Sequence, residues 1–412
     1  MPRRHLTLPL LLAVLLMTAA AGADPVNVDN PAEAPATVDL NLREVWRAGG
    51  DDADDVLLGR IGVVISGPGG EVYALDSQLC EVQVFGADGA HRRTLGREGE
   101  GPGEFRQPIG LFLPGDGTVG VQQPFPGKVE FLDAAEGTPL GSWRLGSDDP
   151  TTGGFVFVQT ARKRGGAFVA SGATSAFDMA TQEIRSTSFL ALVDDDGAEK
   201  TRLYEVPTVR SMVRFTIDEL RDFNPGDRGL WDLGPDGRLW VADAFDRYAL
   251  TVYGPDGQVQ RTVTRDYTAR ERTDEEKDEI RGSMQMNING QVPEIDWVVQ
   301  DRAQCIERLQ VLDDGTVWIR NSHAGVDWAD EGRVTYDVLD AEGRLQREVT
   351  VTVPDGGEGD RLVLLDDGRF VLIKGLDSLS ISISAGDGDE VQATDESLGD
   401  ALLELVCFEA VR

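Results

Sequence analysis

The sequence predicts an all-β fold built from repeated four-stranded antiparallel modules, and two kinds of turn predict it. A small or acidic residue followed by Gly and an apolar run occurs six times, at 68–73, 115–119, 164–169, 235–240, 313–318 and 366–371. A second Gly turn follows in five modules, at 86–89, 134–137, 194–197, 254–257 and 340–343. Glycine supplies the positive φ that tight hairpins need, so two turns per module imply four strands.

The first module illustrates the expected strands, which are 61–66, 71–76, 81–85 and 91–95. The sixth module lacks a second turn, and 402–411 forms its third strand. An N-terminal strand at 38–48 has no hairpin partner nearby, so we expect it to complete the last module and close a ring. Radial four-stranded sheets closed in this way form a β-propeller, here six-bladed and covering 38–412 as a single domain.

Two long intervals interrupt the repeat. The first-turn glycines are spaced by 47, 49, 71, 78 and 53 residues, which predicts short helical insertions after blades 3 and 4, at about 208–227 and 266–302. The second insertion contains a polar helix at 273–281, where Thr273 and Glu276 have the spacing of a capping box.

The N-terminus resembles a secretory signal. Arg3 and Arg4 precede an apolar run at 6–17 and the small residues 21–23, so we expect a signal peptide at 1–23 and export to the periplasm or beyond. The apolar run is too short for a good membrane span. The Pro-, Ala- and Asp-rich stretch 24–37 predicts a flexible leader.

Charge and cysteine content narrow the partners. The formal net charge of −33 disfavours nucleic acid and anionic membranes; it favours cations or basic partners, with simple solubility as the alternative. Cys80, Cys305 and Cys407 allow at most one disulfide in a monomer, and their apolar surroundings favour buried free thiols.

Residues 61–111 carry a more specific pattern. It consists of Gly-Gly-Glu-Val-Tyr-Ala-Leu-Asp at 69–76, Val-Gln-Val-Phe at 82–85, Asp-Gly at 88–89 and Gly-Glu-Gly-Pro-Gly-Glu-Phe at 99–105, and part of it recurs at 237–243 and 250–253. This stretch resembles an NHL repeat. The whole chain is similar to secreted bacterial six-bladed propellers of the NHL-repeat or TolB-like kind.

Antiparallel alternation places the two Gly turns of every blade on one face, which we call the plain face. Interblade links and the long second-to-third strand loops at 172–185, 322–333 and 375–401 lie on the other, elaborated face, which is the candidate binding face. Arginines near the starts of innermost strands could ring the channel mouth there and bind a carboxylate or sugar acid: Arg60, Arg106, Arg228, Arg308 and Arg361. The alternative is that they pair with the abundant acids and hold blades together.

The resemblance also implies an enzymatic alternative, because related propellers include lactonases and amidating lyases with metal ligands at the channel mouth. His91 and His323 are expected on opposite faces, which disfavours a zinc centre. The weak metal candidates are Asp76, Asp243 and Asp327, together with Asn321, and their alternative role is to cap loops. The acidic runs 194–196 and 387–390 invite only a weak surface calcium site.

We therefore expect no catalytic residues and no cofactor beyond a possible calcium ion. The favoured reading is an exported, non-enzymatic, monomeric propeller that binds a protein, peptide or small, potentially anionic ligand on the elaborated face. Asn321, His323 and Trp328 join the five arginines as ligand-binding candidates, Trp328 as a surface for stacking a glycan. Two alternatives stay open: a metal-dependent, lactonase-like hydrolase or lyase at the channel mouth, and a dimer formed through 208–227.

Overall fold

The computed structural model describes residues 24–50, 56–125, 127–145, 155–178, 180–282, 287–288, 294–375, 384–385 and 403–411. The expected signal peptide at 1–23 and most of the loop at 375–401 lie outside these residues. Within them the chain is almost entirely β, with two α-helices, α1 (Asp274–Gly282) and α2 (Trp328–Glu331), and one 3-10 turn at Pro68–Gly70.

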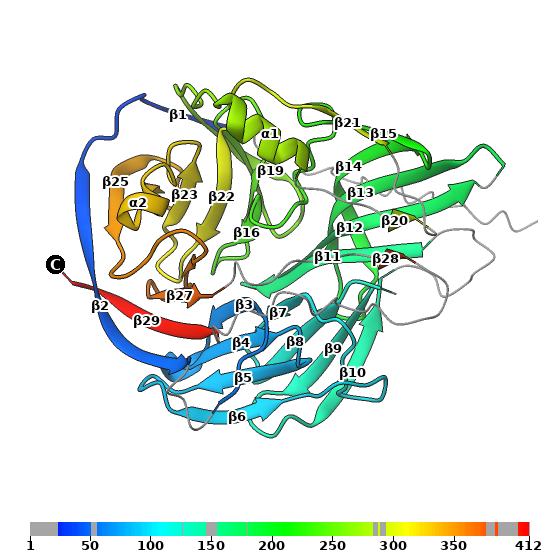
Figure 1. Cartoon of the computed structure of the whole chain (residues 1–412), viewed down its shortest axis with the longest axis vertical. Coiled ribbons are helices and arrows are strands. Elements are labelled where there is room, and N and C mark those ends of the chain that lie inside the picture. The colour runs from blue at the N-terminus through cyan, green and yellow to red at the C-terminus, as the bar shows by residue number, and fades with distance from the viewer. Residues whose placement is uncertain are drawn as a thin grey trace, which may run out of the picture.

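Antiparallel sheets of four strands are arranged in a propeller-like ring (Figure 1). The first three sheets follow one another along the chain, each strand pairing with the next. They are β3 (Ile61–Ser66), β4 (Val72–Asp76), β5 (Glu81–Phe85) and β6 (His91–Leu95); β7 (Gly110–Phe112), β8 (Thr118–Gln123), β9 (Lys128–Asp133) and β10 (Pro139–Arg144); and β11 (Phe155–Arg164), β12 (Ala167–Asp178), β13 (Glu183–Val193) and β14 (Glu199–Ser211). The strand boundaries predicted for the first module differ from these by at most one residue.

The next sheet has a fifth strand from the N-terminus. Its meander is β16 (Trp231–Leu233), β17 (Leu239–Ala242), β18 (Ala249–Tyr253) and β19 (Val259–Arg265). Strand β1 (Val26–Asn30) adds to β19 in parallel, with Val26 opposite Arg261 and Asn30 opposite Arg265.

The remaining large sheet has eight strands, in the order β22, β23, β24, β25, β2, β29, β27, β26. These strands are β22 (Ile306–Val311), β23 (Val317–Asn321), β24 (Arg333–Leu339), β25 (Leu345–Thr352), β2 (Thr37–Gly49), β29 (Glu404–Val411), β27 (Phe370–Lys374) and β26 (Arg361–Leu364). Strand β2 has two partners: residues 37–41 pair in parallel with β25, and residues 41–49 pair antiparallel with β29. The unpartnered N-terminal strand predicted at 38–48 is therefore present and lies against the last strand of the chain.

The prediction of a flexible leader at 24–37 is wrong. The outer strands β19 and β25 expose unpaired backbone groups, and the N-terminal segment satisfies them by adding as a parallel strand to each. The Asn30 side chain donates to Thr264 O (3.1 Å) and Gly343 O (2.9 Å) and accepts from Leu345 N (2.7 Å), which anchors the segment between two sheets.

The two insertions contact each other. The first contributes β15 (Arg214–Asp218), which pairs in parallel with β21 (Glu294–Val298) of the second. The described part of the first insertion is strand and turn, so the helix expected there is not found. In the second, the capping box at α1 is confirmed: Thr273 N donates to Glu276 Oε2 (2.7 Å), and Glu276 N donates to Thr273 Oγ1 (3.2 Å).

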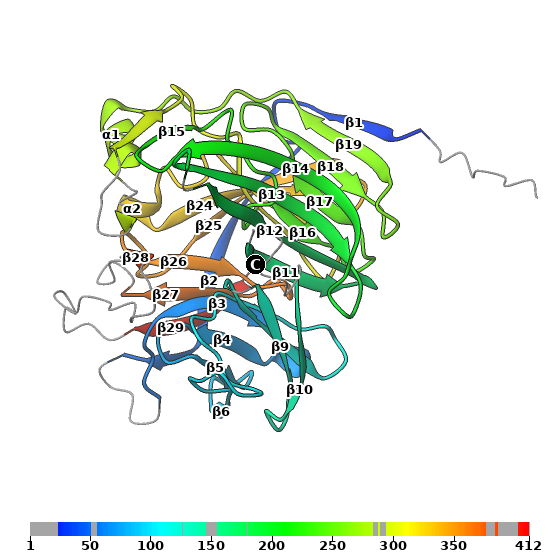
Figure 2. The ribbon, with the colours of Figure 1, turned by 90° about the vertical axis from the view of Figure 1, so that its right-hand side faces the viewer.

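The prediction of a long loop at 172–185 is wrong, because β12 and β13 extend through most of this stretch as a long hairpin. Alternating Ser and Thr side chains there pair across the strands, as at Ser175 and Ser186 (2.8 Å). A short parallel pairing joins β20 (Asn287–Ile288) to β28 (Ser384–Ala385). In side view, α1, α2, β15 and β28 lie on one side of the molecule, as predicted for the elaborated face (Figure 2).

The apolar core lies between neighbouring sheets. One cluster joins Trp240 and Leu250 of the fourth sheet to Ile306, Leu309 and Ile319 of the next, and the other clusters repeat this arrangement around the ring. All three cysteines are free and buried, as expected from their apolar surroundings.

Candidate functional site

The innermost strands surround the axis of the ring (Figure 1). Contacts join β3 to β7, β7 to β11, β11 to β16 and β16 to β22. Hydrogen bonds from Arg361 Nη2 to Ile61 O and Gly62 O (both 3.0 Å) join β26 to β3. Side chains at the two ends of these strands therefore determine what can enter the axis.

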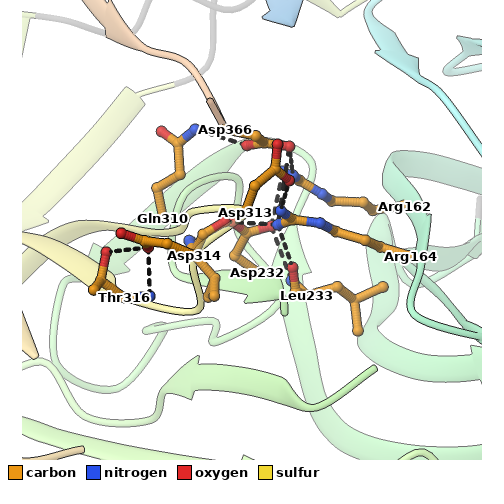
Figure 3. Close-up of polar contacts among 10 residues, drawn as sticks. Arg162, Arg164, Asp232, Leu233, Gln310, Asp313, Asp314, Thr316 and Asp366 are labelled. Carbon is orange, nitrogen blue, oxygen red and sulfur yellow. Dashed lines mark hydrogen bonds and ion pairs between the residues drawn. The ribbon is translucent and has the colours of Figure 1, made fainter. Parts of the chain in front are cut away.

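At one end of the innermost strands, a polar network joins side chains from different sheets (Figure 3). Arg162 of β11 forms an ion pair with Asp232 of β16 (2.8 Å) and another with Asp366, which follows β26. Gln310 of β22 donates to Asp366 (2.9 Å), and Asp232 accepts the backbone N–H of Val311 (2.8 Å). Four innermost strands are thus cross-linked across the centre.

Arg164 extends this network. Its guanidinium donates to Leu233 O (2.9 Å) and Val311 O (2.6 Å) and forms an ion pair with Asp313. Burial opposes ionisation of Asp366, yet the charges of Arg162 and Arg164 hold its pKa below the ordinary value. Burial also opposes the charge on Arg162, but its carboxylate partners Asp232 and Asp366 raise its pKa. This end of the axis is a satisfied structural network in which cations and anions compensate each other.

The opposite end holds arginines of a different kind. Arg228 precedes β16, Arg308 lies on β22, Arg320 lies on β23 and Arg361 begins β26. We call these four residues the arginine cluster. Among the described residues, no carboxylate oxygen lies within 4.0 Å of any of their nitrogen atoms, although the chain has 72 acidic residues. Within the described residues these four arginines therefore form no ion pair, although Arg361 and Arg228 do join neighbouring sheets through hydrogen bonds to backbone carbonyls.

The charges of the arginine cluster act on one another. Burial and the positive charges of Arg308 and Arg228 lower the pKa of Arg361 to about 10. Burial and Arg320 lower the pKa of Arg308, and burial and Arg308 lower that of Arg228. Arg308 and Arg320 are also directly opposed in the antiparallel register, where like charges are unfavourable. The four guanidinium groups thus form one positively charged region without a directly paired carboxylate among the described residues.

Backbone carbonyls hold two of these side chains in place. Arg361 Nη2 donates to Ile61 O and Gly62 O, and Arg228 Nη2 donates to Ile109 O and, at 3.5 Å, to Gln159 O. Arg228 therefore reaches from the fourth sheet to the starts of the second and third. Arg228 and Arg308 keep solvent-exposed side chains even though the surrounding protein lowers their pKa.

Two carboxyl groups adjoin the arginine cluster. Burial raises the pKa of Glu307, against the opposing charges of Arg320 and Arg270. Burial also raises the pKa of Asp227, which accepts hydrogen bonds from Gln159 (3.0 Å) and Asn224 (2.7 Å). Neither carboxyl group forms an ion pair with an arginine of the cluster within the described residues.

Within the described residues, Arg60 resembles Arg361 in having a buried Nε without a partner, whereas Arg106 differs from both. Arg60 precedes β3, and its Nε is buried without a hydrogen-bond partner in the described part of the chain. Arg106 forms an ion pair with Glu100 (3.2 Å) in which both side chains are about two-thirds or more exposed. Arg106 therefore lies outside the arginine cluster.

The other predicted ligand-binding residues have structural partners. Asn321 is buried, donates to Asp337 (2.8 Å) and accepts from His323 N (3.0 Å). The ring of His323 stacks edge-on to Tyr267, with ring centroids 6.0 Å apart. Trp328 begins α2 and packs against the core beneath it. None of the three contributes to the arginine cluster.

The weak metal candidates also bind within the protein. Asp76 is fully buried and accepts the backbone N–H groups of Gly59, Arg60, Gln78 and Leu79. Asp243 accepts from the Thr251 hydroxyl, and Asp327 forms an ion pair with Arg333 (2.7 Å). Asp76 thus has the expected capping role, whereas Asp243 and Asp327 bond other side chains. No group of three or more His, Cys, Asp or Glu in the described residues is placed to hold a metal ion.

Sequence reasoning missed Arg320 and Tyr336. The register about the Gly315 turn would have found Arg320, since it places residue 320 opposite residue 308. Tyr336 of β24 is buried, which raises its pKa, while the nearby charges of Arg320 and Arg308 act in the opposite direction. Its place beside the arginine cluster depends on the packing of β24 against β23 and has no sequence signal.

Comparison with known proteins gives likeness of shape and no family. No family model and no curated protein matches the chain. Solved structures that resemble it include a member of the DUF4221 family from Bacteroides vulgatus (11% identity, TM-score 0.49, covering 90% of this chain and 99% of that one). A Bacteroides fragilis protein described as exported (10%, 0.47, 94% and 100%) and a calcium-binding regucalcin from Agrobacterium tumefaciens (10%, 0.41, 90% and 96%) are similar at a comparable level. Among the described helices, none is long and apolar enough to cross a membrane.

Proposed function

We propose that this chain is an exported, non-enzymatic six-bladed propeller of the NHL-repeat or TolB-like kind. The count of six treats the eight-stranded sheet as two blades that meet at β2: one consists of β22–β25, the other of β26, β27, β29 and the second half of β2. The antiparallel pairing of β2 with β29 supports closure of the ring by the N-terminal strand. Export follows from the signal-like residues 1–23, and a mature protein beginning at Asp24 by mass spectrometry would test it.

The proposed activity is to bind a ligand on the elaborated face through an anionic group. One observation carries this proposal: four arginines converge near the axis without a carboxylate partner, in a chain with an excess of acids. Uncompensated, partly desolvated cations are unfavourable in the free protein, and a bound anion removes that cost. Guanidinium groups also recognise carboxylates by paired hydrogen bonds.

A panel of anionic and neutral metabolites, screened by the shift in melting temperature, tests the activity. We expect anionic compounds to raise the melting temperature of the wild-type protein and to lose this effect in a variant with Arg228→Ala and Arg361→Ala. The matched control is Arg106→Ala, which removes an exposed arginine outside the cluster. Anions that stabilise the double variant as much as the wild type would contradict the proposal. A cation found on the axis by anomalous scattering would instead favour a metal-dependent hydrolase or lyase.

A further inference from the structure

Among the described residues, the charged side chains at the two ends of the axis differ, because those at one end form ion pairs and those at the other do not. Toward the plain face, Arg162, Asp232 and Asp366 link three innermost strands through partly buried ion pairs, and Arg164 donates hydrogen bonds to two of the neighbouring backbones. Toward the elaborated face, Arg228 and Arg308 are exposed residues. A ligand can therefore approach the arginine cluster from the elaborated face.

The arginine cluster brings several charges to one place. Arg308 interacts electrostatically with Arg228, Arg320 and Arg361, so it lies centrally among them. The added Cβ of an alanine at position 229 would lie 3.4 Å from Arg308 Cγ and Nε, so the Arg308 side chain lies directly over the backbone next to Arg228. A single carboxylate can form paired hydrogen bonds with only one of these guanidinium groups.

The outer arginines are oriented before a ligand binds. Arg361 contacts β3, and Arg228 contacts the link before β7 and strand β11. Each side chain makes these contacts through one terminal nitrogen, Nη2. The other guanidinium nitrogens stay available, and the Nε atoms of Arg361 and Arg320 are buried without partners in the described residues. Because these side chains are already ordered, binding loses little conformational entropy.

From this arrangement we infer that the ligand is a small anion carrying two or more negative charges, which bridges guanidinium groups from different blades of the ring. A di- or tricarboxylate and a phosphate share the required chemistry. The inference rests on the proposed anion-binding function and adds the multiple charge and the small size. Glu307 and Asp227 border the cluster and further limit the size of the ligand, because bulky or extended polyanions would approach their carboxyl groups.

Isothermal titration calorimetry with acetate, succinate and citrate, at one ionic strength and in a buffer without multivalent anions, tests the inference. We expect the dissociation constant to fall at least tenfold for each added carboxylate. A titration with inorganic phosphate distinguishes a phosphate ligand from a carboxylate ligand. Arg308→Gln should raise the citrate dissociation constant at least tenfold, whereas the control Arg106→Gln should leave it unchanged.

Stability gives a second readout. Arg308→Gln removes a charge that its neighbours repel, so we expect the ligand-free variant to unfold at an equal or higher temperature than the wild type. Acetate binding as tightly as citrate would refute the multivalent ligand while leaving anion binding intact. An absence of binding by every anion would refute the proposed function itself, and loss of stability in Arg308→Gln would show that this arginine holds the ring together.

Discussion

Asn30 provides a direct test of whether the N-terminal segment belongs to the folded ring. Its side chain is 8% exposed and makes three hydrogen bonds to two sheets: to Thr264 O and Gly343 O as donor and to Leu345 N as acceptor. The partners lie more than 230 residues away in the sequence. Substitution by Ala therefore removes contacts that connect the segment to both β19 and the turn before β25.

The magnitude follows from the groups left behind. Asn30→Ala deprives the buried N–H of Leu345 of its side-chain acceptor, and an unsatisfied buried group costs about 1–3 kcal/mol. The two lost donor bonds add about 0.5–1.5 kcal/mol each, reduced because the carbonyl oxygens keep other lone pairs. We expect the free energy of unfolding to fall by about 2–4 kcal/mol, which lowers the melting temperature by about 2–5 °C for a chain of this length.

The assay is urea unfolding followed by tryptophan fluorescence, with equal m values for the variant and the wild type. Asn27→Ala is the matched control, because Asn27 lies on the same strand but is exposed and bonds only the Thr262 hydroxyl (2.6 Å). We expect the control to lose less than about 1 kcal/mol. If Asn30→Ala is no more destabilising than Asn27→Ala, the segment does not fasten the ring and the reasoning is refuted.

Three further results are expected. The hydrogen bonds and charge of Arg270, with the capping bonds to Thr273, lower the pKa of the Glu276 carboxyl group to about 2, so the stabilisation it provides is present above about pH 4.5 and is lost as the pH falls toward 2. Glu276→Gln should therefore lower the free energy of unfolding by about 0.5–1 kcal/mol at pH 7 and should have no effect near pH 2. Burial raises the pKa of Cys407 to about 11, so a thiol reagent at pH 8 should label none of the three cysteines until the protein is denatured, and labelling of the native protein would contradict their burial. Gly165→Ala should lower the free energy of unfolding in urea by about 3 kcal/mol or more, because the new Cβ would lie 2.1 Å from Gly237 N. In the control Gly166→Ala the new Cβ meets no atom within 4 Å, so this substitution should cost only about 1 kcal/mol, and equal losses would be inconsistent with the close approach at Gly165.

Local signals in the sequence determined the parts of the ring. Gly turns and alternating apolar residues predicted the strands of the first module to within a residue, because hairpin turns depend on backbone dihedral angles that few residues adopt. The capping box of α1 was predictable because both of its hydrogen bonds join residues only three apart in the sequence. The presence of arginines near the starts of innermost strands was also readable from the sequence.

The tertiary structure decided which of those arginines act together. Arg106 and Arg361 occupy similar places in their repeats, yet one is paired with an exposed acid and the other lies within the electrostatic reach of Arg228 and Arg308. Likewise, the segment around Asn30 has the composition of a flexible leader and is held by groups more than 230 residues away. Composition and turn spacing report on neighbours along the chain, whereas charge compensation and edge pairing depend on which strands the tertiary structure brings together.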